Sequence, residues 1–163
     1  MRMWHRNSGF TLIELMIVVV LLAIIATIAV PSFQGLIESN RLKSTTNNVL
    51  GILNYARSEA VRRGEPVAVK ASGSGLNDGL EVVYTDDGGN EEVLRESGPM
   101  PGAVAMTLQS GDMPVFRGDG MKNRDNHDQS ILRICPGNGD PGADIVVNAG
   151  GQTNRSSTAA PCP

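Results

Sequence analysis

A single carboxylate lies inside an otherwise apolar segment near the start of this 163-residue chain. Glu14 belongs to the stretch from Phe10 to Val30, whose 21 residues would form a helix about 32 Å long at about 1.5 Å per residue. A hydrocarbon core is about 30 Å thick, so the segment is long enough to span a membrane. An acidic side chain at mid-membrane costs about 2.5–3.5 kcal/mol. Because the segment contains no basic residue, a functional Glu14 needs a partner outside its own helix.

A second set of polar side chains lies in one loop. Asp119, Asp125, His127 and Asp128 could hold a cation, but their spacing does not match a calcium-binding loop and no glycine lies at the required internal position. A solvated loop is the favoured interpretation and a weak cation site is the alternative. The chain also lacks a nucleophile elbow, a P-loop and a dinucleotide-binding glycine pattern. We therefore expect no enzyme activity, no cofactor and no metal centre.

The charges that flank the apolar segment predict its orientation. Arg2 and Arg6 precede it, and the next basic residue is Arg41, so the positive-inside rule places the first nine residues in the cytoplasm and the C-terminal bulk across the membrane. An ordinary secretory signal, cut at the small-residue site Thr27-Ile28-Ala29, is the alternative. The main expectation is therefore a single-pass protein whose C-terminal domain lies outside the cytoplasm.

At this N-terminus the sequence resembles a known signal. The short basic leader ending in Gly9, followed by Phe10-Thr11-Leu12-Ile13-Glu14-Leu15-Met16 and an apolar helix up to Pro31, is similar to the class III signal of type IV pilins and type II secretion pseudopilins. The resemblance implies a bacterial inner-membrane protein, cleavage after Gly9 by prepilin peptidase, methylation of the new amine of Phe10 and a helix kink at Pro31. It also implies that Glu14 forms a salt bridge with the amine of a neighbouring subunit's Phe10. Snorkelling of Glu14 to the headgroups is the alternative explanation.

The helical pattern continues beyond the apolar segment. Apolar residues recur at helical spacing, Glu59 precedes Arg62 and Arg63 by three and four residues, and Gly64 is a typical helix cap. The apolar face is formed by Val49, Leu53, Ala56 and Ala60. Weak helix formers between Pro31 and Val49 leave two alternatives open: one helix with a bend, or two helices. The predicted organisation is a leader at 1–9, a transmembrane and assembly helix at 10–31, an amphipathic extension at 32–64 and a β-rich periplasmic head at 65–163.

After Gly64 the hydrophobic period changes to about two, which indicates β-strands separated by glycine-rich turns. Asp86-Asp87-Gly88-Gly89-Asn90 is typical of a hairpin turn. Because the helix and an antiparallel sheet each need a cover for an apolar face, we predict an α+β, pilin-like fold with the long N-terminal helix packed against the sheet. The predicted strands are Pro66–Ala71, Leu80–Thr85, Glu91–Glu96, Val104–Leu108, Pro114–Arg117, Ile131–Cys135 and Asp144–Asn148.

The C-terminal part resembles the H-type pseudopilin and FimT/FimU minor pilin family. The resemblance is carried by Phe116-Arg117-Gly118-Asp119-Gly120, Ile131-Leu132-Arg133-Ile134-Cys135, and Ile145-Val146-Val147-Asn148 followed by Gly150-Gly151. It implies a head with two β-sheets and a low-abundance subunit that primes assembly of a pilus or pseudopilus and sits at its tip. Members that bind DNA carry a Gly-Arg-x-Arg motif, where this chain has Gly151-Gln152-Thr153-Asn154. Arg155 is the only arginine nearby, so nucleic-acid binding is not expected.

Two further observations bear on this interpretation. Cys135 and Cys162 are the only cysteines, and both lie on the side placed in an oxidising compartment, so we expect them to form a disulfide. Without Arg2 and Arg6 the 14 basic residues become 12 against 17 acidic ones, a net charge of about −5 that does not attract nucleic acid.

The preferred function is a minor pilin or pseudopilin whose partners are other pilins or pseudopilins, prepilin peptidase and inner-membrane lipid. A DNA-uptake receptor and an anchored periplasmic protein unrelated to filaments are the alternatives. The sequence does not separate a pilus from a type II secretion pseudopilus.

Overall fold

The computed structural model describes residues 10–123, 128–156, 158 and 161–162. The contacts within the chain divide it into two compact units, Met1–Ile37 and Glu38–Pro163. The first unit contributes the apolar part of helix α1, and the second, called the head below, combines the rest of α1 with all the strands.

Helix α1 spans Leu12–Arg63 without interruption. At its start, Thr11 accepts a hydrogen bond from the backbone N–H of Glu14 through its hydroxyl oxygen, at 3.3 Å. At its end, Gly64 adopts a φ of 73°, which favours glycine, and donates its N–H to Ala60 O at 2.9 Å. The single-helix alternative is therefore correct. Thr46 shows why the weak helix formers do not interrupt the helix: it is buried in the head, and its hydroxyl is satisfied by Leu42 O at 2.7 Å.

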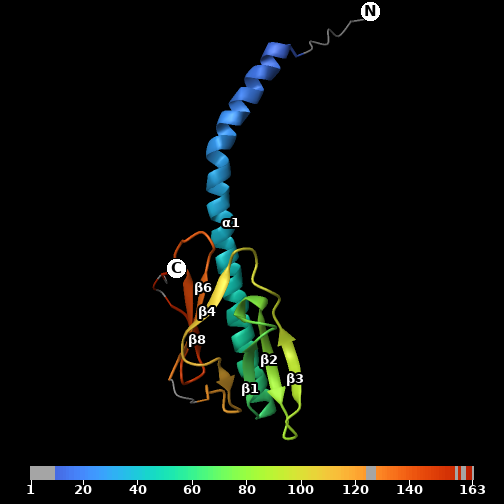
Figure 1. Ribbon diagram of the computed structural model, residues 1–163, viewed down its shortest axis with the longest axis vertical. Helices are drawn as coiled ribbons and strands as arrows, with labels where there is room; N and C mark the ends of the chain where they lie inside the picture. Colours follow the sequence, from blue (N-terminus) through green and yellow to red (C-terminus); the bar gives the residue numbers. More distant parts are fainter. Residues whose placement is uncertain (1–9, 124–127, 157, 159–160, 163) are drawn as a thin grey trace, which may run out of the picture. The chain divides into compact units, whose positions relative to one another are not determined.

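The strands of the head form two antiparallel four-stranded sheets, as the family resemblance implied. The first sheet has the order β3-β2-β1-β5 and the second the order β4-β6-β7-β8. In Figure 1, β1, β2 and β3 lie on one side of the C-terminal part of α1, and β4, β6 and β8 lie on the other. The bounds are β1 Val67–Ala71, β2 Leu80–Thr85, β3 Glu91–Glu96, β4 Ala105–Ser110, β5 Val115–Phe116, β6 Ser130–Cys135, β7 Ala143–Val147 and β8 Thr153–Arg155, with a short 3-10 helix η1 at Leu76–Asp78.

One core joins α1 to both sheets. Alternate residues of the strands point inward, which gives the period of two seen in the sequence. The predicted helix face is buried, together with Ile52, which the sequence pattern did not single out. Fully buried members of this core are Ile52, Leu53 and Ala56 of α1, Val67, Val69, Leu80, Val82 and Phe116 of the first sheet, and Leu132, Ile134, Ile145 and Val147 of the second.

All seven predicted strands are present: β2 and β3 have the predicted bounds, the bounds of the other five differ by one or two residues, and an eighth strand was missed. The predicted turn is confirmed: Asp86 and Asn90 close the hairpin between β2 and β3, with Asp86 N donating to Asn90 O at 3.0 Å. The Asp86 carboxylate accepts bonds from the Asn90 amide and backbone N–H, which lowers the pKa of that carboxyl. The missed strand, β8, pairs with β7 at the edge of the second sheet.

Candidate functional site

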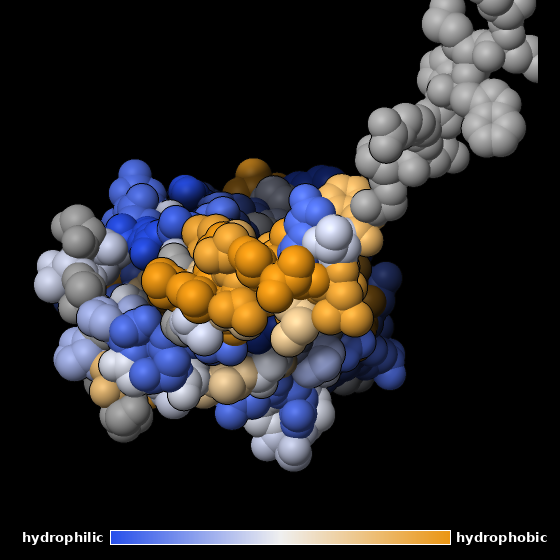
Figure 2. Space-filling view, turned by 90° about the horizontal axis from the view of Figure 1, so that it is seen from above, coloured by the Kyte–Doolittle hydropathy of each residue, from blue (hydrophilic) through white to orange (hydrophobic). Residues whose placement is uncertain are grey.

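The N-terminal unit exposes a long apolar surface. Helix α1 is long and apolar enough to cross a membrane by length and composition, and its most apolar window has a mean hydropathy of 3.0 with no part of it buried. In Figure 2 the hydrophobic residues are gathered in one area, while most of the other visible surface is hydrophilic. Water solvates such a surface poorly, so it needs lipid or other helices around it. Exposed residues include Phe10, Leu12, Ile13, Leu15, Ile17, Leu21, Ile25 and Ile28.

Glu14 occupies the first turn of this helix. Thr11 is the N-cap and Glu14 the third helical residue, which is the spacing of a capping box. The positive end of the helix dipole also stabilises a carboxylate in this turn. Sequence reasoning missed the Thr11 cap, although the Thr-x-x-Glu pattern could have revealed it. None of the ion pairs among the described residues involves Glu14, so these local contacts leave its charge available to an external cation.

The other predicted residues of the anchor are placed only in part. Phe10 is 85 % exposed and lies two residues before the helix begins. Gly9, the expected cleavage position, lies outside the described residues. Pro31 lies within α1, and its kink stays a prediction. A cleaved chain would therefore begin with a charged amine close to the first helical turn, four residues before Glu14.

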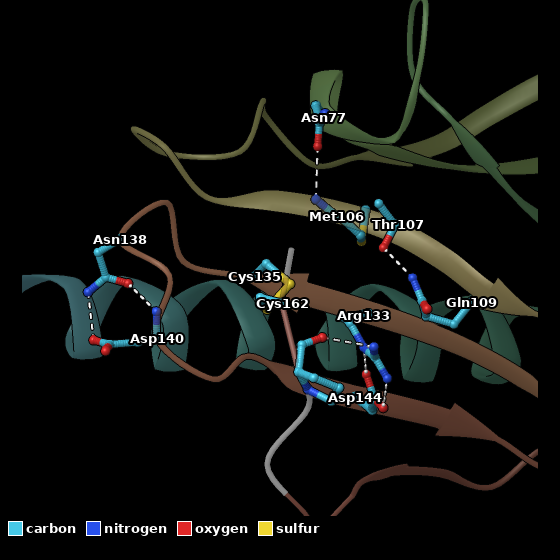
Figure 3. The surroundings of a disulfide bond; sticks show 11 residues. Asn77, Met106, Thr107, Gln109, Arg133, Cys135, Asn138, Asp140, Asp144 and Cys162 are labelled. Carbon is cyan, nitrogen blue, oxygen red and sulfur yellow. Dashed lines mark hydrogen bonds and ion pairs between the residues drawn. A yellow bond between two sulfur atoms is a disulfide. The ribbon is translucent and has the colours of Figure 1, made fainter.

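The predicted disulfide is confirmed. Cys135 at the end of β6 is bonded to Cys162, with 5.8 Å between their Cα atoms (Figure 3). Beside it, Arg133 donates two hydrogen bonds to the Asp144 carboxylate at 2.8 and 2.9 Å, and this pairing raises the pKa of the arginine. Arg133 also donates to Pro161 O at 2.9 Å. These groups alternate with buried residues of β6 and β7, so the C-terminal segment is fixed to the outer face of the second sheet.

The nucleic-acid candidate is weakened by the pairing of the head's basic groups. Arg155 lies on the edge strand β8 and is exposed. A cavity of about 370 Å³ in the head is lined by Arg117, Lys122, Met121, Ala149 and Gly150. However, Arg117 pairs with Asp119 at 3.0 Å, and Lys122 is buried and donates to Asn123 O. Among the described residues, the two basic side chains that line this cavity are therefore already engaged, whereas phosphate binding needs several available cations.

The candidate cation loop is described only in part. The Asp119 carboxylate forms an ion pair with Arg117 and accepts a hydrogen bond from the backbone N–H of Met121, at 3.0 Å in each case. Asp125 and His127 lie outside the described residues. Within the described part of the chain, no group of three or more histidine, cysteine, aspartate or glutamate side chains is placed to hold a metal ion.

Arg57, which sequence reasoning missed, connects α1 to two loops of the head through hydrogen bonds. Arg57 of α1 donates to Gly120 O at 2.9 Å and to Gly150 O at 3.3 Å. A Cβ on Gly151 would lie 2.1 Å from Gly120 O, so only glycine allows the two loops to approach each other. The Gly118-x-Gly120 and Gly150-Gly151 pattern could have signalled this close contact.

Comparison with known proteins agrees with this geometry. The family model described as type II transport protein GspH matches residues 45–151, and that of the prokaryotic N-terminal methylation motif matches residues 4–30. No curated protein sequence matches the chain significantly.

Two crystal forms of the type IV minor pilin FimU from Pseudomonas aeruginosa PAO1 share the fold at 21 % identity. Their TM-scores are 0.62 and 0.58. The first match covers 75 % of this chain and 94 % of FimU, and the second covers 72 % and 95 %.

Proposed function

This chain belongs to the GspH family of type II transport proteins, and we propose that it is a minor pilin or pseudopilin anchored in the bacterial inner membrane. In this proposal the head of the protein lies in the periplasm. Prepilin peptidase removes the first nine residues, and the new amine of Phe10 is methylated. The partners of the protein are other pilins or pseudopilins, and it primes assembly and sits near the tip of the filament. In this role the chain is a structural subunit without catalysis.

The observation that carries the proposal is the combination of an exposed apolar helix with one carboxylate in its first turn. Lipid can cover the apolar surface before assembly, and neighbouring helices can cover it afterwards. In the filament, Glu14 neutralises the amine of a neighbouring Phe10. The offset of four residues corresponds to about 6 Å along a helix, which suits an axial stagger between parallel subunits. Charges in a low-dielectric interior persist when they are paired, so this bond aligns subunits as they leave the bilayer.

Two substitutions of Glu14 test the proposal. Glu14→Val removes both the charge and the capping-box side chain, whereas Glu14→Gln keeps a side chain that can cap the helix and removes only the charge. An unpaired buried amine costs about 3–5 kcal/mol. We therefore expect both variants to insert and fold normally but to be at least about 100-fold depleted from sheared filaments at equal membrane abundance.

The contrast between the variants identifies the role of Glu14. If the glutamine variant assembles normally while the valine variant does not, Glu14 acts as a helix cap. Normal assembly of both variants would reduce Glu14 to a snorkelling residue and refute its assembly role. Genes beside this one that encode either pilus tip components or a secretion cassette would assign the chain to one of the two machines.

A further inference from the structure

The negative charge of the mature chain is concentrated in one hairpin. From Leu80 to Glu96, β2, β3 and their turn contain six acidic residues and one basic residue, Arg95, a net charge of −5. The remainder of the chain after Gly9 contains 11 acidic and 11 basic residues. The six acidic residues of the hairpin are Glu81, Asp86, Asp87, Glu91, Glu92 and Glu96.

Among the residues that the structure describes, the same hairpin contains a free sheet edge. β3 is the last strand of the first sheet, and five of its six residues are exposed. Every second residue of an edge strand presents its backbone N–H and C=O outward. On the outer face of the sheet, Val93 of β3 is 55 % exposed and lies in register with Val83 of β2. Ala68 of β1 and Val115 of β5 continue this apolar row across the sheet.

One ion pair covers the middle of the row. Lys70 of β1 bonds to Glu91 of β3 and so crosses over β2. The pair spans Val83, which is only 1 % exposed although it lies on the outer face. The Lys70–Glu91 pair leaves Val93 exposed to solvent. The second sheet differs, because its outer face holds the C-terminal segment through Cys135 and Arg133.

We propose that β3 and the outer face of the β2–β3 hairpin are a docking surface for a basic head of another filament subunit. This inference rests on the proposed function. The exposed Val93 supplies an apolar contact, and the surrounding carboxylates select a partner of opposite charge. The negative charge of the hairpin disfavours other partners at this surface. Two copies of β3 would place glutamates opposite each other, and anionic lipid headgroups or nucleic acid would be repelled.

Site-specific crosslinking of the full chain in intact cells tests this surface. A photo-crosslinking benzoylphenylalanine replaces Val93, and a matched probe replaces Thr107, which is exposed on β4, an end strand of the second sheet. Mass spectrometry identifies the residues joined to each probe. We expect the Val93 probe to join a different subunit that carries an N-terminal methylation motif, within a segment of net positive charge.

Charge reversal supplies the decisive comparison. Asp87→Lys with Glu81→Lys, which lies on the same face of the sheet as Val83, should reduce the Val93 adduct about tenfold, equivalent to about 1.4 kcal/mol. Asp128→Lys with Asp140→Lys makes the same change of total charge outside the hairpin and should leave the adduct unchanged. The Thr107 adducts should respond to neither pair of substitutions.

The outcomes separate this inference from the proposed function. An adduct between two copies of this chain, an adduct to a neutral or acidic segment, or one unaffected by charge reversal in the hairpin would overturn the docking surface. Absence of a Val93 adduct overturns it as well when the subunit is present in sheared filaments. Absence of the unmodified chain from filaments counts against the proposed function itself.

Discussion

The Cys135–Cys162 bond should provide a large part of the stability of the head. The two cysteines are 27 positions apart, so the bond closes a loop of 28 residues. In the chain-entropy model, a loop of this size contributes about 3.5 kcal/mol by restricting the unfolded state. A small domain has a free energy of unfolding of about 5–15 kcal/mol. Replacing both cysteines by serine should therefore remove between about a quarter and two thirds of that stability.

Urea unfolding of the fragment from Glu38 to Pro163, followed by circular dichroism, measures this loss. We expect the midpoint to fall with little change in slope, and the melting temperature to fall by about 12–16 °C for a loss of about 3.5 kcal/mol. A matched control carries Cys135→Ser and ends at Ser156, so that it lacks the tail altogether. If loop closure is the cause, this control loses as much stability as the double serine variant. An unchanged midpoint in the serine variant would refute the entropic argument.

Three further predictions concern the leader, the glycine contact and DNA. Gly9→Val should leave the precursor inserted but uncut, whereas mass spectrometry of the unmodified protein should detect N-methylated Phe10; an N-terminus at Val30 would indicate ordinary signal cleavage instead. Gly151→Ala should destabilise the head by about 2–4 kcal/mol in a urea titration, because its φ is +73° and its new Cβ would lie 2.1 Å from a carbonyl oxygen. The head should show no gel shift of DNA at micromolar concentration in physiological salt, and a shift abolished by Arg155→Ala would instead favour an uptake receptor.

The strands could be predicted from the sequence because each of them buries alternate side chains. In β6, for example, Ser130, Leu132 and Ile134 are buried and the residues between them are partly exposed. The partition into two sheets has no such local signal. β1 pairs with β5 across more than 40 residues, while β4 pairs with β6 and not with β5. β8 was missed because Thr153-Asn154-Arg155 is short and polar, and only its pairing with β7 makes it a strand.

Some residues of the candidate site could be predicted because their side chains are unusual in their sequence context. Glu14 is conspicuous because a charge in an apolar segment is costly, and the two cysteines because they are the only pair. The ion pair of Arg133 with Asp144 was not predicted. Its members are 11 residues apart in sequence and come together only because β6 and β7 pair in one register.

Arg57 shows why the glycines of the C-terminal part depend on the helix. Its guanidinium lies between two loops and donates one hydrogen bond to Gly120 O and another to Gly150 O. A side chain at Gly151 would contact both Gly120 O and Arg57 Nε, the latter at 3.3 Å, so the residue that packs here must have no Cβ. A similar restriction applies at the helix end, where a Cβ on Gly118 would lie 2.2 Å from Gly64 O. The glycine pattern therefore follows from loops that close directly onto Arg57 of α1 and onto Gly64 just after its end. These contacts connect the β-rich part of the head to the helix.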